Sequence, residues 1–165
     1  MRILPLFFVL ILSSTFLTGC FRNDGCDQEP NTAVDQNQLA LDVDAIESYL
    51  SENNIEAEVH PSGIRYVVNQ AGTGRKPTLC NQVTVRYEGR LMSDGSVFDS
   101  SDRAIAFALN RLITGWQVGI PLIKEGGSIT LYIPSSYAYG RKGAGDDIPP
   151  NANLIFDIEL VAVFN

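Results

Sequence analysis

The chain has 165 residues, a formal net charge of -7 and 45% hydrophobic residues, so it can bury one ordinary hydrophobic core but hardly two. Its pI of about 4.6 and the lack of any basic stripe exclude the positively charged surface by which proteins bind nucleic acid. We therefore expect a single domain and no nucleic-acid partner.

The first 19 residues have the layout of a secretory signal peptide: one arginine, an apolar run too short to span a bilayer, and small residues at the end. The next motif, LTGC, ends at Cys20 and resembles the lipobox of bacterial lipoproteins. This resemblance implies cleavage before Cys20, its lipidation and a firm membrane anchor. Phe21 stands where aspartate would signal inner-membrane retention, so we expect the outer membrane, facing the periplasm. The alternative is an ordinary signal peptide that happens to end near a cysteine.

Lipidation of Cys20 would leave Cys26 and Cys80 in an oxidising compartment, where they can pair in only one way. We therefore predict a disulfide between Cys26 and Cys80. The residues from 20 to 36 are polar and almost without apolar periodicity, which predicts a flexible tether between the lipid anchor and the domain.

A helix and a connector are expected over residues 37–61. Apolar residues recur there at spacings of four, three and four, which places them along one stripe of a helix that Asn53 and Asn54 end. The stripe consists of Leu39, Val43, Ile46 and Leu50. It is typical of a helix that covers one edge of a domain. A dimerisation helix is the alternative, but four apolar positions are few for a coiled coil.

After a turn signal at residues 60–63, the apolar pattern changes from helical spacing to alternation. Alternation is typical of half-buried strands in an antiparallel sheet, joined by short turns such as Ser93-Asp94-Gly95. The alternating apolar residues are Val83, Val85 and Tyr87; Ile105, Phe107 and Leu109; Ile129, Leu131 and Ile133; and Leu154, Phe156, Ile158 and Leu160.

One short helix is expected within residues 114–127, closed by the glycine pair at its end. Trp116, Ile120 and Ile123 have helical spacing there. Pro121 is compatible with this helix only if its missing amide lies within the first turn.

The side chains offer little conventional catalytic chemistry. The only histidine, His60, lies in a turn, which rules out a histidine-dependent triad and a multi-histidine metal site. The stretch 72–74, GTG, lacks the lysine and helix of a phosphate loop and reads as a turn. Asp146 and Asp147 read as a solvated loop tip. We expect no metal and no cofactor.

Three blocks of the sequence, taken together, resemble one known family. VTVRYEGRLMSDGSVFDSS starts at Val83, LITGWQVGIPLIKEGGSITLYIPSSYAYG starts at Leu112, and IPPNANLIFDIELV starts at Ile148. In this order they resemble the FKBP-type peptidyl-prolyl cis-trans isomerases, over about residues 62–165. The resemblance implies an α+β fold, a strongly bent antiparallel sheet wrapped around one short helix, with an apolar pocket between them. It also implies that the loop after YAYG overhangs this pocket.

Site residues follow from the resemblance position by position. It implies that aromatic walls and floor hold a proline ring while the Tyr139 hydroxyl and the Ile113 amide bind substrate carbonyls. The implied catalytic residues are Tyr87, Phe98, Asp99, Trp116, Tyr139 and Phe156, and the implied substrate-binding residues are Arg103, Phe107, Leu112, Ile113 and Ile148.

The sequence departs from the family pattern in several places. The segment 99–107 is one residue shorter than in small prototype domains, which affects the placing of Arg103 and Phe107. Ala144 replaces a frequent histidine, and Asp147 replaces a frequent aliphatic residue. Cys80 occupies a turn position where glycine is common. A more acidic loop should alter peptide preference and weaken the binding of macrolide inhibitors.

The implied function is isomerisation of X-Pro bonds in exported proteins at the cell envelope, by a monomer with proline-containing polypeptides as substrates. Two alternatives remain. One is a lipid-anchored module that binds proline-containing segments as a chaperone or scaffold without turnover. The other is a purely structural lipoprotein, which leaves the aromatic pocket without a purpose.

Overall fold

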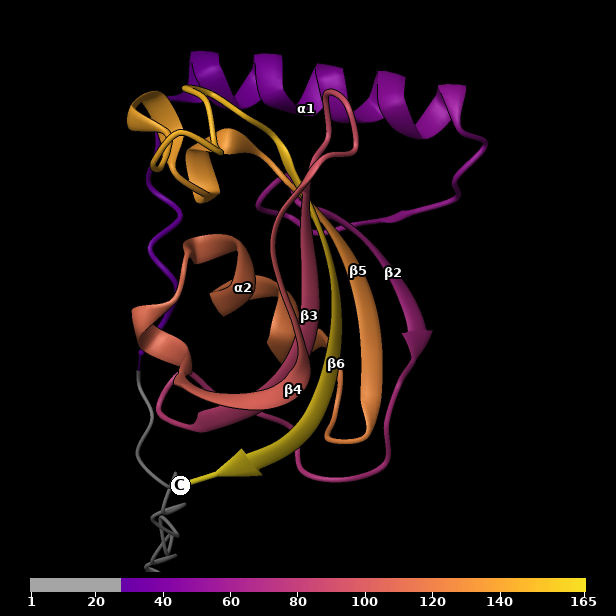
Figure 1. Ribbon diagram of the computed structural model, residues 1–165, viewed down its shortest axis with the longest axis vertical. Coiled ribbons are helices and arrows are strands. Elements are labelled where there is room, and N and C mark those ends of the chain that lie inside the picture. Colours follow the sequence, from indigo (N-terminus) through magenta and orange to yellow (C-terminus); the bar gives the residue numbers. More distant parts are fainter. Residues whose placement is uncertain (1–27) are drawn as a thin grey trace, which may run out of the picture.

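A computed structural model describes residues 28–165, which form a six-stranded sheet and two α-helices (Figure 1). The strand order is β1-β2-β5-β6-β3-β4, and every neighbouring pair is antiparallel. The predicted α+β class is therefore confirmed. The helices are α1 (Gln36–Glu52) and α2 (Thr114–Gly119), and the strands are β1 (Glu58–Val59), β2 (Arg65–Gln70), β3 (Gln82–Leu91), β4 (Val97–Ala108), β5 (Gly127–Ile133) and β6 (Leu154–Phe164).

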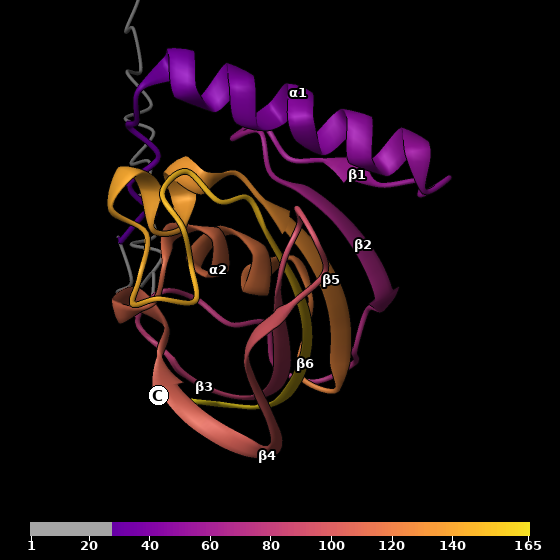
Figure 2. The ribbon, with the colours of Figure 1, turned by 45° about the horizontal axis from the view of Figure 1, so that its top comes forward.

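The sheet curves around α2, and the main hydrophobic core lies between them (Figures 1 and 2). Two glycines on α2 allow the helix to lie very close to β5. A Cβ atom on Gly119 would come within 2.3 Å of Leu131 Cδ1, and one on Gly115 within 2.5 Å of Ile133 Cγ2. Because both positions are glycine, Trp116 is carried against the sheet and is only 4% exposed.

The helix predicted within residues 114–127 is shorter than expected. The α-helical part ends at Gly119, and residues Ile120–Leu122 continue as a 3₁₀ helix with Pro121 near its start. Pro121 therefore lies outside the α-helix and within the first turn of the 3₁₀ helix, where its missing amide is tolerated. Proline removes an amide donor and clashes with the preceding helical turn, so the chain changes helix type at this point.

The four alternating stretches lie in β3, β4, β5 and β6, as predicted, with one exception at the end of β4. Leu109 does not belong to the strand but starts a 3₁₀ helix over Leu109–Arg111, and it is fully buried. The turn between β3 and β4 is confirmed: the Leu91 amide donates to the Ser96 carbonyl at 2.9 Å, and Gly95 has a φ of 74°.

Helix α1 lies across one end of the sheet (Figure 2). Asp35 caps its N-terminus by accepting hydrogen bonds from the amides of Asn37 and Gln38, and Asn53 follows its last turn, as predicted. Ile46 and Leu50 are buried against Tyr132 and Ile155 in a second, smaller cluster. The helix therefore covers an edge of the domain, the first of the two interpretations of its apolar stripe. No helix within residues 28–165 is long and apolar enough to cross a membrane.

The predicted signal peptide, the lipidation of Cys20 and the residue Cys26 lie outside the described residues. Cys80 is disulfide-bonded, while its predicted pairing with Cys26 remains a prediction. The last part of the predicted tether is described and contacts the domain. Val34 packs on the main core, and Gln28 accepts a hydrogen bond from the Asn110 side chain at 3.1 Å.

Candidate active site

A cavity of about 330 Å³ opens between α2, the sheet and the loop that leads into β6. This volume lies at the lower end of the range for small-ligand pockets. The structure brings all the predicted site side chains to this cavity except Arg103 and Ile148. Its lining consists of Tyr87, Phe98, Asp99, Phe107, Arg111, Leu112, Ile113, Trp116, Tyr139 and Phe156.

Aromatic rings form the base and walls of the cavity, and Trp116 is at their centre. Its ring centroid lies 5.2 Å from that of Tyr87, 5.2 Å from that of Phe156 and 6.2 Å from that of Phe107, always nearly perpendicular. Phe98 packs edge-on against Phe156 at 5.5 Å. Edge-to-face contacts of this kind favour fixed ring positions. The cavity is therefore a preformed apolar slot.

The glycine of the motif YEG is Gly89 in β3, and the packing around it leaves no room for a side chain. A Cβ atom at this position would come within 2.6 Å of Phe156 Cε1 and 2.7 Å of Phe98 Cζ. The two rings that form this wall thus occupy the space that a side chain would fill. The local sequence and the packing of the wall are linked at this residue.

One hydrogen bond joins two polar groups of the lining. The Tyr87 hydroxyl donates to Asp99 Oδ2 at 2.8 Å. Burial, then this hydrogen bond and the carboxylate charge, raise the pKa of Tyr87 to about 12. Burial and the charge of Asp99 also raise the pKa of Tyr139. Both phenols therefore stay protonated at neutral pH and can act only as neutral hydrogen-bond donors or acceptors.

Three hydrogen-bond donors around the cavity have no acceptor among residues 28–165: the Tyr139 hydroxyl, the Ile113 amide and the Trp116 indole N–H. The indole nitrogen is fully buried. Unpaired buried donors are rare in folded proteins because they forgo hydrogen bonds to water. An apolar slot with unpaired donors suits a ligand that combines an apolar ring with carbonyl oxygens.

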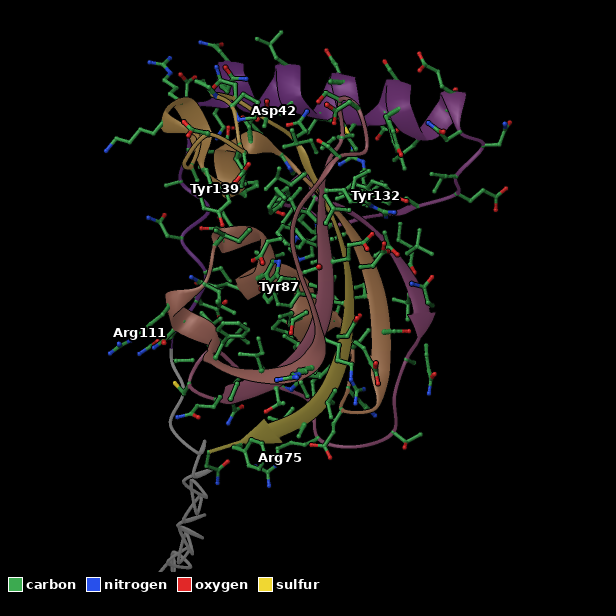
Figure 3. The ribbon with its side chains drawn as sticks, viewed as in Figure 1. Asp42, Arg75, Tyr87, Arg111, Tyr132 and Tyr139 are labelled. Carbon is green, nitrogen blue, oxygen red and sulfur yellow. The ribbon has the colours of Figure 1, made fainter. Side chains whose placement is uncertain are left out.

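Arg111 lines the cavity although no sequence pattern indicated it. It ends the 3₁₀ helix that follows β4, and its side chain lies at the outer edge of the molecule (Figure 3). Within the described part of the chain its guanidinium makes no ion pair or hydrogen bond. Arg103, the predicted rim cation, is exposed on β4 away from the cavity, and Ile148 is 6% exposed within the main core.

The loop that connects β5 to β6 contains the motif YAYG and carries Tyr139, whose side chain points towards α2 (Figure 3). It contains two short 3₁₀ helices, over Ser135–Tyr137 and Gly140–Lys142. It then folds back on itself, with Ala144 and Ile148 paired. A Cβ atom at Gly143 would come within 2.1 Å of the Ile148 carbonyl oxygen, and its φ is 62°, so this turn requires glycine.

Other parts of the molecule lack comparable chemistry. Asp146 and Asp147 are exposed, as predicted, and no group of metal-ligating side chains occurs within residues 28–165. A larger cavity of about 660 Å³ lies between residues 28–32, the turn at 60–62 and the far side of α2. Its lining contains no phenylalanine, tyrosine or tryptophan. The aromatic cavity is therefore the better candidate, although it is smaller.

The structure is of the α+β class, with a bent antiparallel sheet, one short helix beside it and an aromatic cavity between them. Residues 73–161 match the family model for the FKBP-type peptidyl-prolyl cis-trans isomerases. The chain belongs to this family.

Several known proteins are similar to this chain. A probable FKBP-type peptidyl-prolyl cis-trans isomerase, FkpA, of Neisseria meningitidis is 48% identical over 122 residues, covering 71% of this chain and 44% of the relative. The outer membrane protein MIP of Legionella longbeachae is 38% identical over 122 residues, covering 71% of this chain and 52% of the relative. The chain thus spans about half the length of these relatives.

A solved structure supports the same assignment. The crystal structure of a peptidyl-prolyl cis-trans isomerase from Pseudomonas syringae has a TM-score of 0.67 to this chain at 34% identity. The similarity covers 86% of this chain and all of that one. The similarity thus covers more of this chain than the family match at residues 73–161.

Proposed function

We propose that the protein catalyses the cis-trans isomerisation of X-Pro peptide bonds in exported polypeptides. The observation that carries this proposal is the aromatic slot around Trp116 with unpaired donors at its rim. A proline ring fits a slot with apolar walls, and the carbonyl groups on either side of it need hydrogen-bond donors. The family of the chain and the names of its relatives support the same activity.

The reaction requires no covalent step. Resonance makes the C–N bond of an amide partly double, so rotation has a barrier of about 18–20 kcal/mol. Twisting the bond returns electron density from oxygen to nitrogen, which makes the twisted amide less polar than the planar one. An apolar slot therefore binds the twisted form better than water does, and each 1.4 kcal/mol or so of this preference gives about a tenfold rate increase.

The donors at the rim fix one side of the bond while the other side rotates. In this proposal the Tyr139 hydroxyl and the Ile113 amide bind carbonyl oxygens of the substrate. Asp99 accepts the Tyr87 hydroxyl hydrogen bond, so its role is to hold the wall of the slot and not to transfer a proton. The proposed catalysis is a matter of shape, desolvation and orientation.

A protease-coupled isomerisation assay on the chain from Phe21 onward tests the proposal. We expect a rate well above the thermal rate for a peptide with an apolar residue before proline. Phe98→Ala should lower kcat/KM by about tenfold or more, because it removes an aromatic wall. Phe164→Ala is the matched control, since Phe164 is 54% exposed and does not line the cavity.

Two outcomes of this assay would contradict the proposal. A rate equal to the thermal rate, with the peptide still bound, would favour the non-catalytic chaperone or scaffold module. Equal activity of Phe98→Ala and Phe164→Ala would show that the aromatic cavity is not the catalytic site.

We further propose that the protein acts at the cell envelope, anchored to the outer membrane by a lipid on Cys20 and facing the periplasm. The motif LTGC supports this location, and so does the similarity to a relative named as an outer membrane protein. The disulfide between Cys26 and Cys80 belongs to the same proposal. Fatty-acid labelling of the wild type, but not of Cys20→Ala, is the expected result, and an unlabelled wild type would contradict the anchor.

A further inference from the structure

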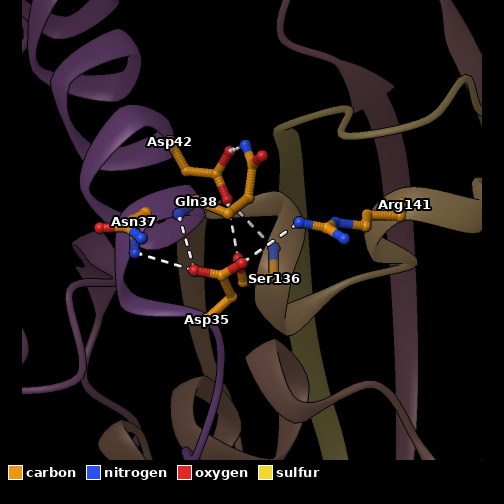
Figure 4. Close-up of polar contacts among 6 residues, drawn as sticks. All are labelled: Asp35, Asn37, Gln38, Asp42, Ser136 and Arg141. Atoms are coloured by element: carbon orange, nitrogen blue, oxygen red, sulfur yellow. Dashed lines mark hydrogen bonds and ion pairs between the residues drawn. The ribbon is translucent and has the colours of Figure 1, made fainter.

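A buried carboxylate on α1, outside the cavity, is bonded to the loop that carries Tyr139. Asp42 is only 3% exposed. Its Oδ2 accepts a hydrogen bond from the Ser135 hydroxyl at 2.7 Å. The same oxygen accepts from the Ser136 amide and hydroxyl, both at 3.1 Å (Figure 4). Its Oδ1 accepts from the Gln38 side chain at 2.8 Å. A buried charge is tolerated only when it is paired or well hydrogen-bonded, and these donors meet that requirement.

The same region of the loop has further bonds to α1. The Asn153 side chain donates to the Asp42 backbone carbonyl at 3.2 Å, and its oxygen accepts from the Ser135 amide at 2.9 Å. Beyond Tyr139, Arg141 pairs with Asp35, the N-cap of α1, at 3.3 Å (Figure 4). The loop is thus attached to α1 on both sides of Tyr139.

Tyr139 has few constraints of its own. Its side chain is 39% exposed, and its hydroxyl makes no hydrogen bond within residues 28–165. Its place over the cavity therefore depends on the backbone of the loop. The buried bond between Asp42 and Ser135, with the partly buried bonds to Ser136, constrains that backbone together with Tyr137, which is 2% exposed in the main core. The Arg141 pair is exposed and adds less.

We propose that Asp42 is a positioning residue for the reaction: through Ser135 and Ser136 it holds the loop so that the Tyr139 hydroxyl faces the bound peptide. This inference rests on the proposed function. It makes α1 part of the machinery that orients the substrate, in addition to its role in covering the sheet. No sequence pattern indicates this role, because an aspartate between the apolar positions of a helix resembles an ordinary polar residue.

The test measures kcat and KM for the full mature chain and its variants with an X-Pro peptide. Asp42→Ala removes the carboxylate that accepts from Ser135 and Ser136, and we expect kcat/KM to fall by roughly tenfold. Asp42→Asn leaves one oxygen to accept the loop bonds, so it should retain most of the activity. Rescue by Asn and not by Ala is the result expected from a hydrogen-bonding role.

A double-mutant cycle with Tyr139→Phe separates positioning from a general loss of stability. If Asp42 acts through the Tyr139 hydroxyl, Asp42→Ala should lower kcat/KM by about tenfold in the wild type and by less than about twofold in Tyr139→Phe. If the kcat/KM losses of Asp42→Ala and Tyr139→Phe instead multiply in the double variant, the proposal is overturned.

Glu47→Ala provides the matched control on the same helix. Glu47 pairs with the largely buried Arg65 of β2 at 2.5 Å and does not contact the loop. This variant should lower the free energy of unfolding while leaving kcat/KM unchanged. An equal loss of kcat/KM in Glu47→Ala and Asp42→Ala would overturn the positioning role, whereas an inactive wild type would instead contradict the proposed function.

A second variant keeps the test decisive if Asp42→Ala does not fold. Ser135→Ala with Ser136→Ala removes both hydroxyl donors and keeps the backbone bond to Asp42. We expect this variant to fold and to lose less kcat/KM than Asp42→Ala does. In the Tyr139→Phe background, its effect on kcat/KM should disappear. Full activity of this folded variant would contradict the proposal.

Discussion

The packing and hydrogen bonding of the cavity depend on a few single residues. Trp116 contacts three other rings, and Gly89 leaves the space that Phe98 and Phe156 fill. The Tyr87 hydroxyl already donates its proton to Asp99, whereas the Tyr139 hydroxyl makes no hydrogen bond within residues 28–165. The two tyrosines of the lining thus differ in their bonding, and we propose that only Tyr139 donates to the substrate.

The raised pKa of Tyr87 predicts how stability changes at alkaline pH. The folded-state pKa is about 12, above the ordinary value of 10, so the folded state holds this proton more tightly than the unfolded state does. The stabilisation of the folded state that comes from this raised pKa is fully present below pH 10 and is lost as the pH rises towards 12. We expect Tyr87→Phe to lose less stability than the wild type over this range, measured by urea unfolding. Equal losses would contradict the assignment of this shift to Tyr87.

Arg111 predicts a preference for acidic residues next to the substrate proline. It is exposed at the cavity and has no ion-pair partner among the described residues, so its charge is available to a peptide. Arg111→Glu should change the ratio of kcat/KM for glutamate- and lysine-containing peptides by about fivefold in favour of lysine.

Arg103→Glu is the control for this charge reversal. It introduces the same change of charge on β4, but its position does not line the cavity. If both variants shift the ratio equally, the effect comes from the net charge of the protein and not from a contact at the site.

At the scale of elements, the sequence predicted most of the fold. The alternation at Val83, Val85 and Tyr87 and in the later strands arises because one face of each strand is turned to the core. Such alternation can be read directly from the sequence. The short strand β1 has no such pattern, because it has two residues, both exposed. Pairing with β2, a tertiary contact, makes it a strand.

The candidate site was only partly predictable for a related reason. The motifs around Phe98, Trp116 and Tyr139 retain the spacing of the family, and the structure brings these side chains together. Arg111 and Asp42 belong to no motif. Their placement depends on the length of the segment after β4 and on the contact between α1 and the loop, and neither can be read from local sequence.

The close approach of α2 to β5 makes Gly119 a sensitive position. A Cβ atom there would lie within 2.3 Å of Leu131 Cδ1, and Leu131 is fully buried. We expect Gly119→Ala to lower the free energy of unfolding by about 1–3 kcal/mol through overpacking. Urea unfolding measures this change.

Leu131→Val tests the cause of that loss, because valine lacks the atoms that would clash. In this background Gly119→Ala should cost less than in the wild type. Equal costs in both backgrounds would show that the loss comes from something other than the contact with Leu131.

At the scale of the whole molecule, the sheet has two differently used faces. Its concave face holds α2 and the aromatic cavity (Figures 1 and 2). Helix α1 packs against part of the other face and also contacts the loop that carries Tyr139. The bonds from α1 to the loop connect these two regions. Residues before the family match at 73 therefore contact the loop that carries Tyr139.

The most direct test of the central claim is exchange NMR on one X-Pro peptide with a substoichiometric amount of the protein. It reports binding and the interconversion of cis and trans forms in the same sample. We predict exchange cross-peaks between the two forms for the wild type and greatly weakened ones for Phe98→Ala. Binding to the aromatic cavity without any acceleration of exchange in the wild type would contradict the account.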